Sequence, residues 1–370
     1  MTSKNTFLKI AILSVLFGLA AGVVGQLVST AYLLPKEVLI LGENGRIRKT
    51  AAEIEENEKI AEAHRITAPT IFEIYLQKPA SRDPLGQIYL PKERVAFGVI
   101  LTSDGWLASF GKNLTDPKDH FIVVTADQKI FSPQKIIFDE ATEATFLKIE
   151  TQNLPVPKLG EYGNLALGEK VIIPFGKQSM KITQIENLAY EKNSEPKDLI
   201  KSSEKFSKSI LFKDNLNANE IGAPIVNLNG EVVGIASGPD GTGTPINFWR
   251  SAFLTLLKNN QIKRPYLGAR YLNLAKAIGL SETISQNKIA GALIWGDKNL
   301  QIKGAEKNSP AAKAGLRDGD IILKINDEEI SQKIDLAEII QKYSPDDILE
   351  LTILRDKKEK TVEVTLGEKL

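Results

Sequence analysis

The sequence predicts a mainly β protein that begins with a membrane-spanning helix and ends in a small α+β domain. An uncharged apolar run covers residues 10–28. Short β-branched segments separated by turn signals fill residues 71–253, and a helix-then-strand pattern follows residue 264. Many short strands at near-regular spacing indicate a β-barrel or a sandwich. A chain of 370 residues has room for about two or three domains.

The apolar run is the expected membrane anchor. As a helix, residues 10–28 would extend roughly 28 Å, enough to cross the hydrocarbon core of a bilayer. A cleaved signal peptide, the alternative, usually has a shorter apolar region of about 7–15 residues. Lys4 and Lys9 precede the run and favour a cytoplasmic N-terminus. We therefore expect residues 1–34 to be a signal anchor of a single-pass cell-membrane protein whose globular domains lie outside the cytoplasm.

Composition excludes several kinds of site. The net charge of +1 provides no basic face of the kind that binds nucleic acid. The chain has no cysteine, which removes thiol nucleophiles, disulfides and cysteine-ligated metals. The two histidines, His64 and His120, belong to no cluster with metal-ligand spacing. We expect neither a metal nor a cofactor.

Residues 66–260 carry the strand pattern, after a juxtamembrane connector at 35–65 that is charged and helix-prone towards its end. The pair Asn229-Gly230 between two apolar runs predicts a β-hairpin. One polar interruption, residues 190–209, is rich in lysine and serine and is expected to be a solvated loop. The expected strands are IFEIYL, VAFGVILTS, WLAS, FIVVTAD, KIIF, TFLKIE, KVIIPFG, KITQIENL, PIVNL and EVVGIAS.

The C-terminal unit, residues 264–368, combines helix and strand signals. Ser309 is an expected helix N-cap, because a proline follows it at the first helical position. Gly315 supplies the left-handed residue that ends this helix, and Asp318-Gly319 predicts a turn into the next strand. A strand pair and a second helix complete a small α+β domain.

The order of these parts resembles the HtrA (high-temperature-requirement) family of serine proteases. The segment SPAAKAGLRDGDIILKIND is similar to the PDZ domain of that family, while VAFGVILTSDGWLAS and ALGEKVIIPFG are similar to strands of its protease domain. The stretch NEIGAPIVNLNG resembles the family's nucleophile loop, Gly-Asn-Ser-Gly-Gly-Pro-Leu-Val-Asn. The resemblance implies a trypsin-like double β-barrel at 66–260 and a PDZ domain at 264–368.

The family's catalytic residues are replaced at the matching positions. Ile221 stands at the place of the nucleophilic serine, Lys112 at that of the general base, and Glu143 at that of the aspartate. Asn219 replaces the glycine whose backbone N–H serves the oxyanion hole. A hydroxyl becomes a useful nucleophile only when a positioned base takes its proton. The resemblance with these substitutions implies a catalytically inactive homologue, a pseudoprotease.

A Ser-Lys dyad is the substitute mechanism to consider. Lys112 could act as its base, but the dyad needs a serine at the tip that Ile221 occupies. Ser109 lies on the same strand segment as Lys112 and is expected to face elsewhere by strand alternation. The sequence therefore predicts no working dyad.

The resemblance also implies what the protein binds. We expect it to bind polypeptide clients or protein C-termini in envelope protein quality control, as an adaptor or regulator. An active serine endopeptidase is one alternative, and a structural envelope scaffold or regulatory subunit of an active paralogue is another. Members of the family assemble as trimers, which implies a homotrimer with Phe72 and Tyr75 near the expected contact.

Binding is expected in a groove of the PDZ domain. By the resemblance, the loop Tyr266-Leu267-Gly268 holds the peptide carboxylate with backbone N–H groups, and the next strand offers an edge for an added strand. The helix of KIDLAEIIQKY is expected to form the opposite wall. The residues expected to line the groove are Tyr266, Leu267, Gly268, Ala269, Arg270, Ile334, Ala337, Ile340 and Gln341.

Overall fold

The computed structural model describes residues 14, 17–18, 21–25, 51–116, 120–297 and 302–369. The chain divides into two compact units, Met1–Ala61 and Glu62–Leu370. The predicted anchor at 10–28 lies largely outside the described residues, and those described within it are helical. No helix in the described ranges is long and apolar enough to cross a membrane. Helix α2 (Ala51–Thr67) covers the charged end of the predicted connector.

The first barrel is a seven-stranded sheet in the order β5-β4-β1-β2-β3-β7-β6, and each neighbouring pair is antiparallel. Its apolar face forms one core cluster that includes Phe72, Ile74 and Leu107. Phe72 and Tyr75 are 0% and 4% exposed within the monomer, so these two aromatics offer no surface to a trimer contact. The strands are β1 (Ile71–Leu76), β2 (Arg94–Ile100), β3 (Trp106–Phe110), β4 (Phe121–Thr125), β5 (Ile130–Phe131), β6 (Lys135–Asp139) and β7 (Ala144–Lys148).

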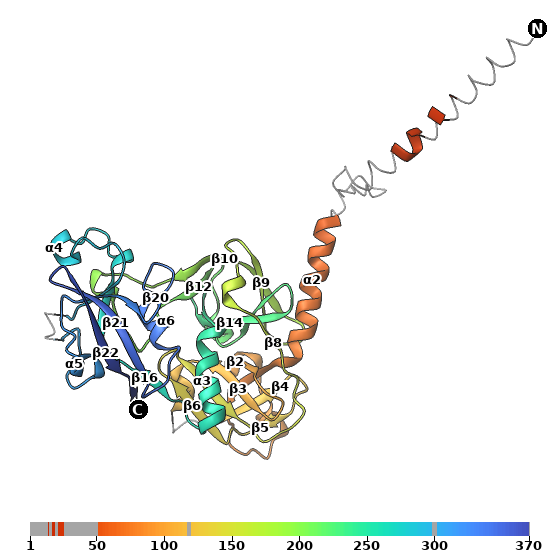
Figure 1. Ribbon diagram of the computed structural model, residues 1–370. Helices are drawn as coiled ribbons and strands as arrows, with labels where there is room; N and C mark the ends of the chain where they lie inside the picture. The colour runs from red at the N-terminus through yellow and green to blue at the C-terminus, as the bar shows by residue number, and fades with distance from the viewer. Residues whose placement is uncertain are drawn as a thin grey trace, which may run out of the picture. The chain divides into compact units, whose positions relative to one another are not determined.

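The second barrel has the order β13-β9-β10-β12-β15-β14-β8. Among these strands, Figure 1 labels β8, β9, β10, β12 and β14. An additional β13–β14 pairing closes the first six of these strands into a ring. The predicted hairpin at Asn229-Gly230 is confirmed, since Gly230 has a φ of 75° between the two antiparallel strands. The strands are β8 (Lys158–Leu159), β9 (Lys170–Pro174), β10 (Met180–Tyr190), β12 (Ser209–Phe212), β13 (Pro224–Asn227), β14 (Glu231–Gly238) and β15 (Thr242–Pro245).

Helix α3 (Ile246–Asn259) is a departure from the strand pattern expected to continue to Phe253. It begins directly after Pro245 and is capped by Asn260, which has a left-handed conformation. Trp249 and Phe253 pack their rings against Phe146 of the first barrel, at centroid distances of 6.3 and 5.7 Å. Tertiary packing of an apolar face therefore stabilises this helix. A search for short apolar runs in the sequence does not detect such packing.

The C-terminal part contains a sheet in the order β11-β17-β18-β19-β21-β22, with β20 paired to β19; its first strand, β11, is Ile200–Ser202. The predicted cap is confirmed, because Ser309 Oγ accepts the Ala312 N–H at 3.1 Å at the start of α5 (Pro310–Lys313). The remaining elements are β16 (Arg264–Tyr266), β17 (Arg270–Asn273), α4 (Glu282–Ser285), β18 (Ala292–Ile294), β19 (Ile321–Ile325), β20 (Glu328–Glu329), α6 (Leu336–Ile340), β21 (Ile348–Arg355), β22 (Lys358–Thr365) and β23 (Gly367–Lys369).

Strand β11 (Ile200–Ser202) comes from the segment 190–209, which the sequence predicted to be a solvated loop. That prediction is wrong for its middle: Ser203, Glu204 and Lys208 are 0%, 4% and 6% exposed. The polar composition suits solvent, but pairing of β11 with β17 brings Ser203 and Glu204 against the loop before β17. Lys208 is instead held by Lys333 and Glu338. The pairing joins residues about 70 positions apart, so local composition could not predict it.

Candidate functional site

Ile221 lies in a tight turn that leads into β13 of the second barrel. Ile221 follows the short helical turn Ala218–Glu220, and its carbonyl accepts the Phe97 N–H at 3.0 Å. Gly222 has a φ of 85°, and a Cβ there would lie 2.0 Å from the Phe97 carbonyl oxygen. Only glycine fits this approach, because a side chain would collide with backbone as well as strain φ. The turn is therefore sterically specified although its tip carries a half-buried isoleucine.

Three backbone N–H groups of this turn donate to backbone carbonyls. Glu220 donates to the Asn217 carbonyl at 2.9 Å, Gly222 to Ala236 at 2.9 Å, and Ala223 to Glu220 at 3.2 Å. The Glu220 carboxylate accepts both the N–H and the side-chain amide of Asn217 at 2.8 Å. Burial alone would raise the pKa of Glu220, but these hydrogen bonds and Lys181 lower it overall.

The remaining predicted positions do not form a triad. The side chains of Lys112 and Glu143 are exposed. Their two segments are joined by a backbone hydrogen bond, in which the Gly111 N–H donates to the Glu143 carbonyl at 3.0 Å. In the part of the chain that the structure describes, no hydrogen bond or ion pair joins the side chains of Lys112 and Glu143. Asn219 is half-buried, with its carbonyl 3.5 Å from Arg94 Nε.

Ser109 is the hydroxyl closest to a candidate dyad in the sequence. It is fully buried on β3 and donates to the Phe97 carbonyl at 2.5 Å. Lys112 is exposed beyond the end of that strand, so the expectation that the two side chains face different surroundings is confirmed. A buried hydroxyl held by a backbone carbonyl has neither a base nor access to substrate.

The loop that precedes β17 collects backbone N–H groups around one carboxylate. Leu267 and Gly268 donate to Glu204 Oε1 at 3.2 and 2.9 Å, and Ala269 donates to Ser203 Oγ at 3.0 Å. Successive N–H groups of this kind form an anion-binding nest. The sequence indicated the loop through its glycine. Glu204 was missed, because nothing in a lysine- and serine-rich stretch marks one glutamate as buried.

Gly268 is required by the geometry of this loop. Its φ is 72°, and a Cβ would lie 2.3 Å from the Ser309 Cβ. Tyr266 beside it donates to Glu306 Oε2 at 2.9 Å. Burial, followed by that hydrogen bond and the charge of Glu306, raises the pKa of the Tyr266 hydroxyl to about 12. Arg270 forms an ion pair with Glu306 at 3.4 Å, so the loop is flanked by polar contacts.

The helix expected to face the loop is shorter than predicted, because α6 begins at Leu336. Ile334 precedes it and is 37% exposed, while Ala337 and Ile340 are buried. Ile340 belongs to the apolar core of this unit. The side-chain amide of Gln341 contacts β16 at the start of the PDZ domain. Its Oε1 accepts from Arg264 at 3.3 Å, and its Nε2 donates to the Pro265 carbonyl at 3.2 Å. These contacts place Gln341 and Ile340 in structural roles.

The fold defines a trypsin-like pair of β-barrels joined to a PDZ domain. A PDZ-domain family model matches residues 301–355. Within the described residues, no three side chains of the types that ligate metals come together.

Curated relatives point to one type of protein. A probable periplasmic serine endoprotease, DegP-like, of Pseudomonas putida is 28% identical over 298 residues, covering 77% of this chain and 58% of the relative. Its counterpart in Hahella chejuensis is 29% identical over 283 residues, covering 73% and 56%. The chain thus spans somewhat more than half the length of these relatives.

Solved structures share the fold. The HtrA-type protease AlgW with decapeptide superposes with a TM-score of 0.59 at 23% identity, covering 84% of this chain and 98% of that one. The serine endoprotease from Yersinia pestis gives 0.53 at 19%, covering 88% and 100%. The chain is therefore similar in sequence to DegP-like serine endoproteases, and it has the fold of an HtrA-type protease with a PDZ domain.

Proposed function

We propose that the protein is an extracytoplasmic, HtrA-like pseudoprotease that binds polypeptide C-termini or unfolded segments through its PDZ groove. The observation that carries the proposal is the nest at Leu267 and Gly268, whose N–H groups converge on a single carboxylate oxygen. A peptide C-terminus presents the same anion. The HtrA-type protease AlgW has been solved with a decapeptide and with a tripeptide, which supports a peptide as ligand.

Inactivity is the second part of the proposal. Isoleucine at position 221 has no atom that can attack a carbonyl, and the lysine and glutamate at the other two positions are exposed. An active serine endopeptidase is the alternative that the names of the relatives favour. Residues outweigh fold in assigning chemistry, because one fold hosts many activities. A role as scaffold or as regulatory subunit of an active paralogue is compatible with the same groove.

Peptide binding is expected to depend on a free carboxylate. An unstructured decapeptide that ends in leucine should bind at least about tenfold more tightly as the acid than as the amide, because hydrogen bonds to a charged group contribute about 1.5–3 kcal/mol. The intrinsic affinity of the free groove should be in the micromolar range, about ten micromolar, as is typical of a small interface. Fluorescence anisotropy with the two labelled peptides measures the difference. Equal affinity of acid and amide would refute the carboxylate site.

We further propose that residues 1–34 anchor the protein in the membrane and that the groove faces the extracytoplasmic space. The length of the apolar run and Lys4 and Lys9 before it support this placement. Protease added to intact spheroplasts should digest the globular part. Protection of that part, or release of a form that begins near Ala31, would contradict the anchor.

A further inference from the structure

The strand edge that a peptide would need is already paired. Strand β11 runs antiparallel to β17, with Ile200 opposite Leu272 and Ser202 opposite Arg270. The other edge of β17 pairs with β18. A peptide that adds as a strand to β17 requires a free edge. The protein's own segment therefore lies where an external peptide would lie.

The same segment continues into the carboxylate nest. The Ser203 N–H donates to the Ala269 carbonyl at 2.9 Å, which extends the pairing by one residue. The Glu204 carboxylate then accepts the N–H groups of Leu267 and Gly268. Glu204 is only 4% exposed, so its charge is withdrawn from water and compensated by these donors. A side-chain carboxylate thus takes the place of a C-terminal one.

The segment is shaped so that an internal residue can imitate a chain end. The hydroxyls of Ser202 and Ser203 donate to the two oxygens of Glu204 at 2.7 and 2.6 Å. The Lys205 N–H donates to the Ser202 carbonyl at 3.3 Å, and this turn carries the chain out of the groove. Phe206 then stacks on Phe248 of α3 at a centroid distance of 4.1 Å.

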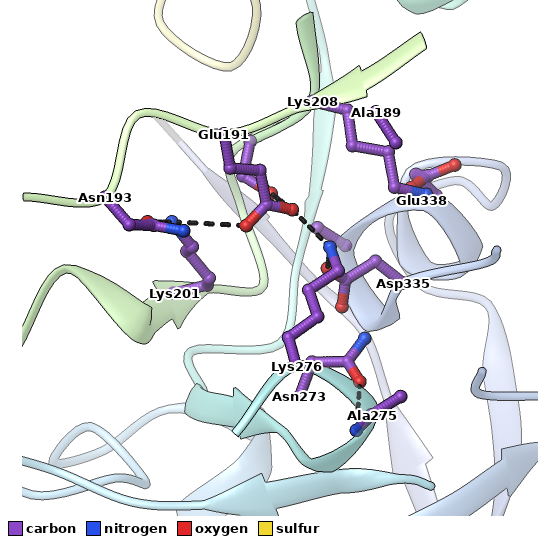
Figure 2. Close-up of polar contacts among 12 residues, drawn as sticks. Ala189, Glu191, Asn193, Lys201, Lys208, Asn273, Ala275, Lys276, Asp335 and Glu338 are labelled. Carbon is purple, nitrogen blue, oxygen red and sulfur yellow. Dashed lines mark hydrogen bonds and ion pairs between the residues drawn. The ribbon is translucent and has the colours of Figure 1, made fainter. Parts of the chain in front are cut away.

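Ionic contacts hold the N-terminal end of the segment against the PDZ domain. Figure 2 shows Glu191 between Lys276 and the Lys201–Asn193 pair. Glu191 forms ion pairs with Lys276 and, at 3.5 Å, with Lys201, and its side chain is 5% exposed. Burial alone would raise the pKa of Glu191, but Lys276 and Lys201 lower it overall. Lys276 also lies 3.5 Å from Asp335, which caps α6.

The other end of the segment is tied to the opposite wall of the groove. Lys208 is 6% exposed, donates to the Lys333 carbonyl at 2.6 Å and pairs with Glu338 of α6. The segment between Glu191 and Lys208 is thus held at both ends and along its middle.

We propose that residues 200–204 are an internal ligand of the PDZ groove, which an external peptide must displace in order to bind. This inference rests on the proposed peptide-binding function. It also names the ligand class: an extended segment that pairs with β17 and ends in a carboxylate, supplied either by a C-terminus or by a glutamate at a turn such as Ser-Ser-Glu.

The competition should be strong. A segment tethered by short links has an effective concentration of about millimolar, and an affinity of about ten micromolar for the free groove gives roughly 100-fold suppression of external binding. Removing the carboxylate of the internal ligand should therefore raise the apparent affinity for an external peptide by about 10- to 100-fold.

The test uses the full-length protein in detergent and a fluorescein-labelled decapeptide that ends in leucine with a free carboxylate. Glu204→Ala and the double variant Ser203→Ala/Glu204→Ala are compared with wild type by anisotropy. Glu186→Ala is the matched control, since it removes an exposed glutamate on β10. In parallel, hydrogen exchange follows the amides of residues 200–204 and 267–269 with and without peptide.

We expect both Glu204 variants to bind the peptide about 10- to 100-fold more tightly than wild type, with Glu186→Ala unchanged. In wild type, saturating peptide should accelerate exchange in residues 200–204 and leave 267–269 protected. Equal affinity of all variants, with exchange in 200–204 unaffected by peptide, would overturn the internal ligand and leave peptide binding intact. If no variant binds the peptide, even one in which the amides of residues 267–269 exchange faster and are therefore free, both the proposed function and the competition are overturned.

Discussion

Ile221→Ser alone is expected to leave the protein without proteolytic activity. The substitution restores a hydroxyl, but a serine hydroxyl needs a positioned base, and Lys112 is exposed without a side-chain hydrogen bond to Glu143 in the described chain. In a serine protease, loss of the base lowers kcat by about 10⁶-fold.

The measurement is release of fragments from unfolded casein, together with labelling by a fluorophosphonate probe. Ile221→Ala is the matched control, because it shortens the same side chain without adding a hydroxyl. Trypsin reports that the assay works. Fluorophosphonate labelling at position 221 in the native variant, absent after unfolding, would show that a base and an oxyanion site are present after all.

Asp139→Ala is expected to cause the largest loss of stability. Asp139 at the end of β6 pairs with Arg264 at the start of the C-terminal unit, and the two side chains are 1% and 8% exposed. Its carboxylate also accepts the Thr142 hydroxyl at 2.6 Å. Removing one partner of a buried pair leaves the other charge uncompensated, which costs about 3–5 kcal/mol.

Urea denaturation followed by circular dichroism measures this change. Asp127→Ala is the control, because Asp127 pairs with Lys129 at side-chain exposures of 54% and 70%. An exposed pair contributes about 0–1 kcal/mol, so the control should shift the unfolding transition little. A loss below about 1 kcal/mol for Asp139→Ala would mean that Arg264 finds other partners, such as Ser251 and Gln341.

Local periodicity predicted the strands well, because both barrels consist of short apolar runs between turn residues. The expected runs IFEIYL and TFLKIE correspond to β1 and β7. Helix α3 was missed, since its aromatic residues are apolar enough to continue a strand pattern and its apolar face is selected by packing on Phe146. The cap and turn predicted at Ser309 and Gly230 are confirmed, because such signals depend on only a few neighbouring residues.

The candidate sites divide in the same way. The identity of residue 221 and the glycine of the loop at 268 are local facts, so the sequence alone indicated both. The burial of Glu204 arises from pairing between β11 and β17, and a polar segment gives no local sign of such a partner. Gln341 was expected at the groove wall, but contacts with Arg264 and Pro265 direct it elsewhere.

The central claim is that the protein holds peptides without cutting them. The most direct measurement incubates the full-length protein with saturating leucine-ended decapeptide, isolates the complex and determines the mass of the bound peptide. We predict that the bound peptide is recovered at its full mass, and that its amide form is not retained. Recovery of fragments that the Ile221→Ala variant does not produce would contradict the account.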